Sequence, residues 1–268
     1  MSILAGIRQA EQRKTEIRSE HIALALCYAF ALYSLAHFGL SEDQTGQAQA
    51  VETMLLLLLP ILMEKTLHCR MAAWLSVYAT LHCLGPMIGH SYQLYYTTVW
   101  WDKLQHTSSG ILFAVIGLYI PILLNGDQPV SLPLRVFCAV CFSITLSALW
   151  EILEFTSDQL FATDTQNDTY LTAINSYFLG AAPGELGHIA EIESVIVNGI
   201  EMPGYIDIGL IDTMHDMMVQ TLGALSVGIT AALDKGRHPA IILTKVPGRQ
   251  KSHQNEQAVS GFSTVNPL

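Results

Sequence analysis

The sequence predicts an all-α fold: a polytopic membrane helix bundle with about six transmembrane helices and a long extracytoplasmic loop. Of the 268 residues, 51% are hydrophobic and 13% are charged, whereas a soluble domain carries about 25% charged residues. A helix needs about 20 mostly apolar residues to cross a bilayer, because lipid offers the backbone no hydrogen-bond partner. Several stretches of the chain approach or exceed that length. Lipid is therefore expected to be the main solvent of this protein.

The predicted membrane-spanning helices follow one another with short connections except before the last. They are expected at His21 to Leu40, Ala50 to Met63, Met71 to His90, Leu104 to Leu124, Leu132 to Phe155 and Thr213 to Leu233. The second is the shortest and contains Pro60, so a tilted or partly re-entrant segment would also fit. Three regions result: a cytoplasmic N-terminal segment at residues 1–20, a transmembrane domain at residues 21–236, and a disordered cytoplasmic tail at residues 237–268.

Basic residues gather on one side of the predicted bundle and set its orientation, because cytoplasmic loops are rich in Lys and Arg. Of the 13 basic residues, only Lys103 falls on the side of the long loop. The others are Arg8, Arg13, Lys14, Arg18, Lys65, Arg70, Arg135, Lys235, Arg237, Lys245, Arg249 and Lys251. Both termini are therefore expected in the cytoplasm, and the multi-pass chain in the cell inner (plasma) membrane.

The long loop, residues 157–211, is acidic and lacks Lys and Arg. Its acids are Asp158, Asp164, Asp168, Glu185, Glu191, Glu193, Glu201 and Asp207. Two of its segments, Leu171 to Ala182 and Gly187 to Ile200, carry apolar residues at near-helical spacing. We expect this loop on the non-cytoplasmic side, where these segments could lie on the membrane surface and cover the cluster as a lid. Packing within the loop would explain the spacing equally well.

Three predicted helix ends meet the outer membrane face, and each carries a polar motif. The motif residues are Asp102, Lys103 and His106 at the fourth helix, Glu151, Glu154 and Asp158 at the fifth, and Asp212, His215 and Asp216 at the sixth. Spacings of three and four place Asp102 with His106 on one helix face, Glu151, Glu154 and Asp158 on another, and Asp212 one turn from both His215 and Asp216. Ionisable groups at membrane depth cost roughly 2.5 to 3.5 kcal/mol each, so they are expected to face the bundle interior and pair there.

The expected cluster contains many carboxylates and one fixed cation, Lys103, so it needs either a further cation or shared protons. Oxygen and imidazole donors at helical spacings suit a divalent ion such as Zn²⁺, Mn²⁺, Fe²⁺ or Mg²⁺. The candidate metal ligands are Asp102, His106, Glu151, Glu154, Asp212, His215 and Asp216. His106 or His215 is a candidate general base, and Lys103 a candidate partner for an anionic group such as a phosphate. These roles fit a metal-dependent site that acts on a lipid or envelope component from the outer leaflet.

Other interpretations of the same residues stay open. Asp102 fits the first turn of a helix, where the macrodipole favours an acid, and Asp212 fits an N-cap. A proton- or cation-coupled transporter would use the acids as a relay. It would need polar residues farther inward, but 111–124 and 137–149 are almost wholly apolar apart from Ser and Thr. An accessory protein without catalytic activity would recruit a partner through its acidic loop. The net charge of −10 argues against a nucleic-acid partner.

The motifs Asp102-Lys103 with His106, Trp150-Glu151-Ile152-Leu153-Glu154 and Asp212-Thr213-Met214-His215-Asp216 resemble the YjdF-like family of bacterial inner-membrane proteins. They are more distantly similar to VanZ-like proteins, which share a DK..H element and a final helix with a small-residue stretch, here Leu222 to Leu225. The resemblance covers residues 100–233, and the loop before Asp212 is longer than the family pattern. It implies membrane location and, for the VanZ-like proteins, an envelope-related role, but no particular reaction.

Overall fold

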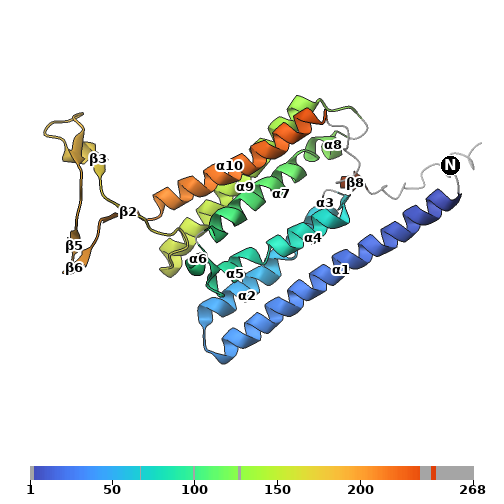
Figure 1. Cartoon of the computed structure of the whole chain (residues 1–268), viewed down its shortest axis with the longest axis horizontal. Coiled ribbons are helices and arrows are strands. Elements are labelled where there is room, and N and C mark those ends of the chain that lie inside the picture. Colours follow the sequence, from blue (N-terminus) through green and yellow to red (C-terminus); the bar gives the residue numbers. More distant parts are fainter. Residues whose placement is uncertain (1–2, 67, 99, 126–127, 236–242, 246–268) are drawn as a thin grey trace, which may run out of the picture.

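The computed structural model describes residues 3–66, 68–98, 100–125, 128–235 and 243–245, and they are mainly helical (Figure 1). The helices are α1 (Ile3–Leu40), α2 (Gln44–Leu56), α3 (Leu59–Thr66), α4 (Ala73–His82), α5 (Gly85–His90), α6 (Leu94–Thr97), α7 (Trp101–Gly117), α8 (Ile120–Leu124), α9 (Leu132–Phe161) and α10 (Leu210–Leu233). The longer helices run side by side, as the predicted membrane bundle requires (Figure 1). The helical fold class is thus confirmed.

Among the described residues, five helical segments are long and apolar enough to cross a membrane. They are Ser19–Leu40, Gln44–Thr66, Trp101–Leu124, Leu132–Phe161 and Leu210–Leu233. The third predicted helix, Met71 to His90, is not among them, because it is divided into α4 and α5, with Pro86 in the first turn of α5. Proline lacks the amide hydrogen that a continuous helix needs, so it favours a new start at this point. The count of six is therefore not confirmed.

Helices α7, α9 and α10 pack on one another and form what we call the three-helix unit. Small residues allow the backbones of α7 and α10 to touch, as is common between membrane helices. A Cβ atom on Gly110 of α7 would overlap the carbonyl oxygen of Gln220 on α10, and one on Gly223 of α10 would lie 2.5 Å from the carbonyl oxygen of Thr107. This close contact fixes the first turns of α7 opposite those of α10.

Replacing Gly110 by alanine is expected to lower the Tm of the detergent-solubilised protein, because the new methyl group meets rigid backbone. Overpacking of this kind costs about 1 to 3 kcal/mol. Gly39→Ala is the matched control, since nothing lies within 4 Å of a Cβ atom at that helical glycine. Equal Tm values for the two variants would contradict the close packing of α7 on α10.

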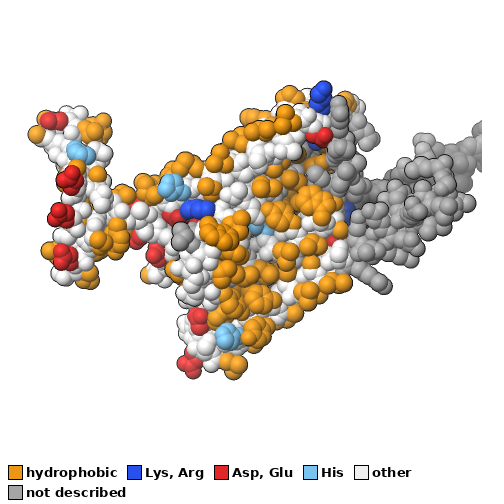
Figure 2. Space-filling model, in the orientation of Figure 1, with side chains coloured by type: hydrophobic (Ala, Val, Ile, Leu, Met, Phe, Trp, Pro, Cys, Tyr) orange, Lys and Arg blue, Asp and Glu red, His pale blue; other side chains and the backbone are white. Residues whose placement is uncertain are grey.

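A lobe of short strands, residues 162–209, joins α9 to α10 and projects beyond one end of the helices, which we call the lobe end (Figure 1). Its antiparallel pairs are β2 (Tyr170–Leu171) with β7 (Tyr205–Ile206), β3 (Ile174–Ser176) with β4 (Gly187–Ile189), and β5 (Val195–Val197) with β6 (Ile200–Met202); η1 (Tyr177–Leu179) is a 3₁₀ turn. Acidic side chains gather on the lobe, whereas hydrophobic ones cover the helical body (Figure 2).

The lobe corrects the expectation of membrane-surface segments within Leu171 to Ala182 and Gly187 to Ile200. Both contain extended strands, and the lobe points away from the helices instead of covering them (Figure 1). The β5–β6 hairpin turns at Asn198 and Gly199, whose φ values of 50° and 84° suit a two-residue type I′ turn. Turn chemistry therefore outweighs the apparent helical spacing here.

At the end opposite the lobe, β1 (Cys69–Met71) pairs with β8 (Leu243–Lys245) in an antiparallel register. The tail was predicted to be disordered from residue 237 onward, and this is wrong for the three residues of β8. The connection between α3 and α4 supplies β1, which gives the backbone N–H and C=O groups of β8 hydrogen-bond partners. Composition alone does not reveal such a partner. The rest of the predicted tail, residues 237–242 and 246–268, lies outside the described residues.

Candidate functional site

The ammonium group of Lys103 is the centre of a polar cluster at the lobe end of the three-helix unit. Its Nζ atom lies 2.8 Å from Asp102 Oδ2, 2.7 Å from Asp212 Oδ1 and 2.7 Å from Asp216 Oδ1. Asp102 and Lys103 belong to the first turn of α7, while both other aspartates belong to α10, one turn apart. One lysine therefore ties α7 to α10 through three carboxylates.

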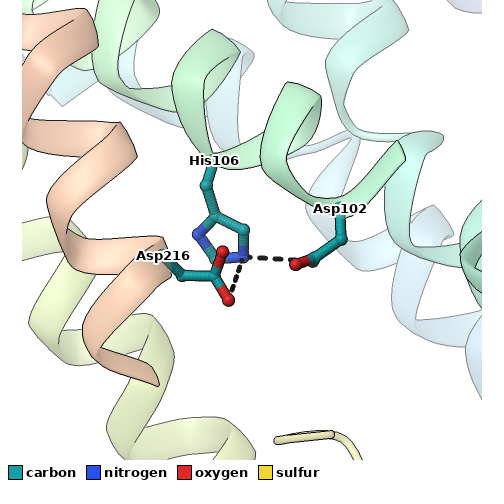
Figure 3. A group of neighbouring side chains, drawn as sticks. All are labelled: Asp102, His106 and Asp216. Atoms are coloured by element: carbon teal, nitrogen blue, oxygen red, sulfur yellow. Dashed lines mark ion pairs between the residues drawn. The ribbon is translucent and has the colours of Figure 1, made fainter. Parts of the chain in front are cut away.

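His106 lies one turn below Asp102 on α7 and faces α10 (Figure 3). Its Nε2 atom is 3.5 Å from Asp102 Oδ1 and 3.8 Å from Asp216 Oδ2. These are the carboxylate oxygens that do not bond Lys103. The donor atoms of the three residues all lie within 4.8 Å of one another, which is close enough to hold one metal ion. Asp216 is nearly inaccessible, with its side chain 2% exposed.

Glu151 of α9 lies on the other side of the His106 ring. Its Oε1 atom is 3.9 Å from His106 Nδ1, and both carboxylate oxygens are buried and unpaired among the described residues. The Thr213 hydroxyl is a near neighbour, but its close contact is with Gln166 Nε2 at 2.6 Å. A buried polar group without a partner is rare, because its desolvation is not repaid. Glu151 is thus available to a ligand.

The remaining predicted site residues lie nearby in other roles. Glu154 accepts a hydrogen bond from Trp150 Nε1 at 2.8 Å and stays partly exposed. Asp212 bonds Lys103 and also accepts from the backbone and side-chain nitrogens of Asn167, each at 3.2 Å. His215 is exposed on α10, and no described contact joins it to the cluster. The structure therefore brings together Asp102, Lys103, His106, Glu151, Asp212 and Asp216, with Glu154 at the margin and His215 outside.

Two of the capping expectations have different outcomes. Asp102 does lie in the first turn of α7, where the helix dipole favours an acid. Asp212 is not an N-cap, because α10 begins earlier and its N-cap is Gly209, at a φ of 77°. Asp158 is also structural, since its Oδ1 accepts from the backbone nitrogen of Thr165 at 2.8 Å and from the hydroxyl of the same residue. It fixes the chain where α9 ends.

A family model described as a predicted membrane protein family, DUF2238, matches residues 21–237. The chain belongs to this family. The DUF2238 match includes α7, α9 and α10 together with the lobe, so the whole cluster lies within the family region. No curated protein and no solved structure matches the chain. Membership of DUF2238 thus establishes a membrane protein, and the chemistry of the site must be argued from its residues.

Two residues beside this DUF2238 site were not predicted from the sequence. Burial raises the pKa of Tyr95, and the nearby charges of Asp102, Glu154 and Asp216 raise it further, so this phenol stays protonated beside the cluster. No sequence signal marks it, because it reaches the site from the short helix α6. Ser147 is different: it precedes Glu151 by four residues, and that spacing was a readable signal of a shared helix face.

Proposed function

We propose that this protein binds a divalent metal ion within the membrane, at the lobe end of the three-helix unit. Asp102, His106 and Asp216 would be the ligands, and Glu151 a fourth. The observation that carries the proposal is a set of converging donor atoms from two helices. Asp102 Oδ1, His106 Nε2 and Asp216 Oδ2 face one another, and beside them lies the buried carboxylate of Glu151, which has no hydrogen-bond partner among the described residues.

Charge supports a cationic ligand. Asp102, Asp212, Asp216 and Glu151 are acidic, and Lys103 is the only fixed cation that bonds this group among the described residues. One lysine cannot balance four carboxylates at membrane depth, so a divalent ion would lower the cost of ionising them. One imidazole with three carboxylates is a donor set that suits Mn²⁺, Fe²⁺ or Zn²⁺.

The same geometry argues against an anionic headgroup as the primary ligand. Lys103 was the candidate partner for a phosphate, but its three short bonds to aspartates already balance its charge. For Lys103 to bind an anionic group of a lipid or envelope substrate, one of these three bonds would have to break. We therefore propose a cation, and not a lipid headgroup, as the primary ligand. We also propose, from the positive-inside rule, that the lobe lies outside an inner membrane and that both termini lie in the cytoplasm. The motif resemblance to the YjdF-like family agrees with that location.

Metal binding to the purified protein tests the proposal. After treatment with a chelator, titration with Mn²⁺, Zn²⁺ and Mg²⁺ in a calorimeter is expected to show one site per chain for at least one ion. His106→Ala removes a central ligand and is expected to weaken binding by about 100-fold or more. His215→Ala is the matched control, since it removes an exposed histidine from the same end of the unit.

Two results would contradict metal binding. One is the absence of saturable binding for all three ions in folded protein, which would leave shared protons as the way in which the carboxylates coexist. The other is an equal loss of affinity in the two histidine variants, which would place the ion on the surface.

A further inference from the structure

The buried face of α9 continues inward from the candidate metal site as a row of polar residues. Glu151, Ser147, Ser143, Ala139 and Arg135 are spaced by four and are the buried residues of this helix. Four of the five are polar, although the outward face of the same helix is apolar and exposed. Serine and alanine are common where membrane helices pack, but ionisable residues such as Glu151 and Arg135 are rare there and mark functional sites.

The serine hydroxyl groups of this row differ from most other hydroxyl groups in the bundle in their hydrogen-bond partners. Serine and threonine in membrane helices commonly bond the carbonyl oxygen four residues earlier. Thr145 of α9 does this, donating to Cys141 O at 2.8 Å. Ser143 instead donates across the interface to Gly110 O at 3.3 Å, and Ser147 Oγ is buried without any partner among the described residues. The row therefore directs oxygen atoms into the interior of the three-helix unit.

Another polar side chain enters the same interior from α10. Gln220 is buried, and its Nε2 atom donates to Ser143 O at 3.0 Å. Oxygen atoms from Glu151, Ser147 and the Ser143–Gln220 pair thus occur at successive helical turns below the cluster. Oxygen is the donor that hard divalent cations accept most readily.

The opposite end of the row is closed in this structure. A Cβ atom on Gly117 of α7 would lie 2.8 Å from Ala139 Cα, so the two helices touch between Ser143 and Arg135. Arg135 is buried, its Nε atom donates to Leu118 O at 3.2 Å, and its guanidinium lies 5.7 Å from the centre of the Tyr119 ring. A fixed positive charge at this point repels a cation that has come down the row.

We propose that the metal site is the entrance of a cation path along α9, and that the protein carries a divalent cation across the membrane. The inference rests on the proposed metal site. The cation moves inward from Glu151 past Ser147 to the level of Ser143 and Gln220. Release at the far end requires α7 and α9 to separate and Arg135 to move away, so the structure represents the state closed at that end.

Mn²⁺ uptake by proteoliposomes tests this path. The full chain is reconstituted, Mn²⁺ is added outside, and quenching of an enclosed calcein dye reports entry. Ser147→Ala is expected to retain Mn²⁺ binding in the calorimeter and to slow uptake by about tenfold. Thr145→Val is the matched control, because it removes a hydroxyl from the exposed face of the same helix, and its uptake is expected to equal that of the wild type.

The outcomes separate the two proposals. Wild-type protein that binds Mn²⁺ but gives no uptake above empty vesicles overturns the path and leaves the metal site standing. If Ser147→Ala and Ser143→Ala both take up Mn²⁺ as fast as the wild type, the path is also overturned, because the ion then crosses elsewhere. Protein that neither binds nor transports Mn²⁺, Zn²⁺ or Mg²⁺ overturns the metal site itself. Slower uptake in both serine variants, with binding retained, supports the path.

Discussion

Lys103→Met is expected to be the most destabilising single substitution in the cluster. It leaves three aspartates near one another without the ammonium group that bonds all of them. Removing one partner of a buried ion pair costs about 3 to 5 kcal/mol, and we expect the lower end because the Lys103 side chain is 33% exposed. In metal-free detergent solution this corresponds to a fall in Tm of roughly 5 to 10 °C.

Added divalent cation distinguishes an electrostatic loss from a packing loss. Mn²⁺ is expected to restore part of the Tm of Lys103→Met, because a bound ion supplies the missing positive charge. Lys65→Met removes an exposed lysine of α3 and is expected to leave the Tm unchanged. A Lys103→Met protein that is as stable as this control would show that the three aspartates do not depend on the lysine.

Replacing Glu151 by leucine is expected to separate stability from metal binding. Both Glu151 oxygens are buried and receive no hydrogen bond from the part of the chain that the structure describes, so their desolvation is not repaid in the metal-free protein. Leucine has a similar volume and no polar atom, and we expect it to raise the free energy of unfolding by about 1 to 2 kcal/mol in chelator. The same variant is expected to lose Mn²⁺ affinity by about 100-fold or more, because the fourth ligand is gone.

Denaturant titration in chelator and calorimetry with Mn²⁺ measure the two effects on the same preparation. Glu154→Leu is the control for Glu151→Leu, since Glu154 has a partner in Trp150 and is partly exposed. It is expected to bring no gain in stability. If Glu151→Leu is less stable than the wild type, the carboxylate must have a partner that the metal-free structure does not provide.

The helical bundle was predictable from the sequence, because a helix that crosses lipid must have both a minimum length and a mostly apolar composition. The second predicted helix, Ala50 to Met63, is longer in the structure, at Gln44–Thr66, since polar residues at its ends can reach the interface. The division of the third was less predictable. A single proline, Pro86, favours a new helix start, yet many membrane helices continue through proline when neighbours compensate.

Helical spacing indicates which residues share a face, but not which face looks inward. Asp212, His215 and Asp216 lie within one turn and were treated alike, yet Asp216 is buried and His215 is exposed. The rotation of α10 is fixed by its contact with α7 at Gly110 and Gly223, and single-sequence spacing does not encode that contact. Whether these residues act as ligands stays a prediction.

The strands of the lobe were missed because apolar residues at mixed spacings fit a helix and a twisted strand about equally well. The Asn198-Gly199 pair between two short apolar runs was the stronger signal, since it is typical of a two-residue hairpin. Long-range pairing, such as β2 with β7 across the whole lobe, has no comparable local signal.

The length of α1 has a mechanical consequence. Its 38 residues rise by about 1.5 Å each, giving a rod of roughly 57 Å, whereas the hydrocarbon core is about 30 Å thick. Its apolar part is Ser19–Leu40, so the backbone of residues 3–18 extends past it by roughly 24 Å. Because this extension is about 24 Å long, a tilt of α1 by about 10° would displace Ile3 by roughly 4 Å relative to the start of the apolar part. A spectroscopic label there would amplify small rearrangements inside the bilayer into displacements that can be read in the aqueous phase.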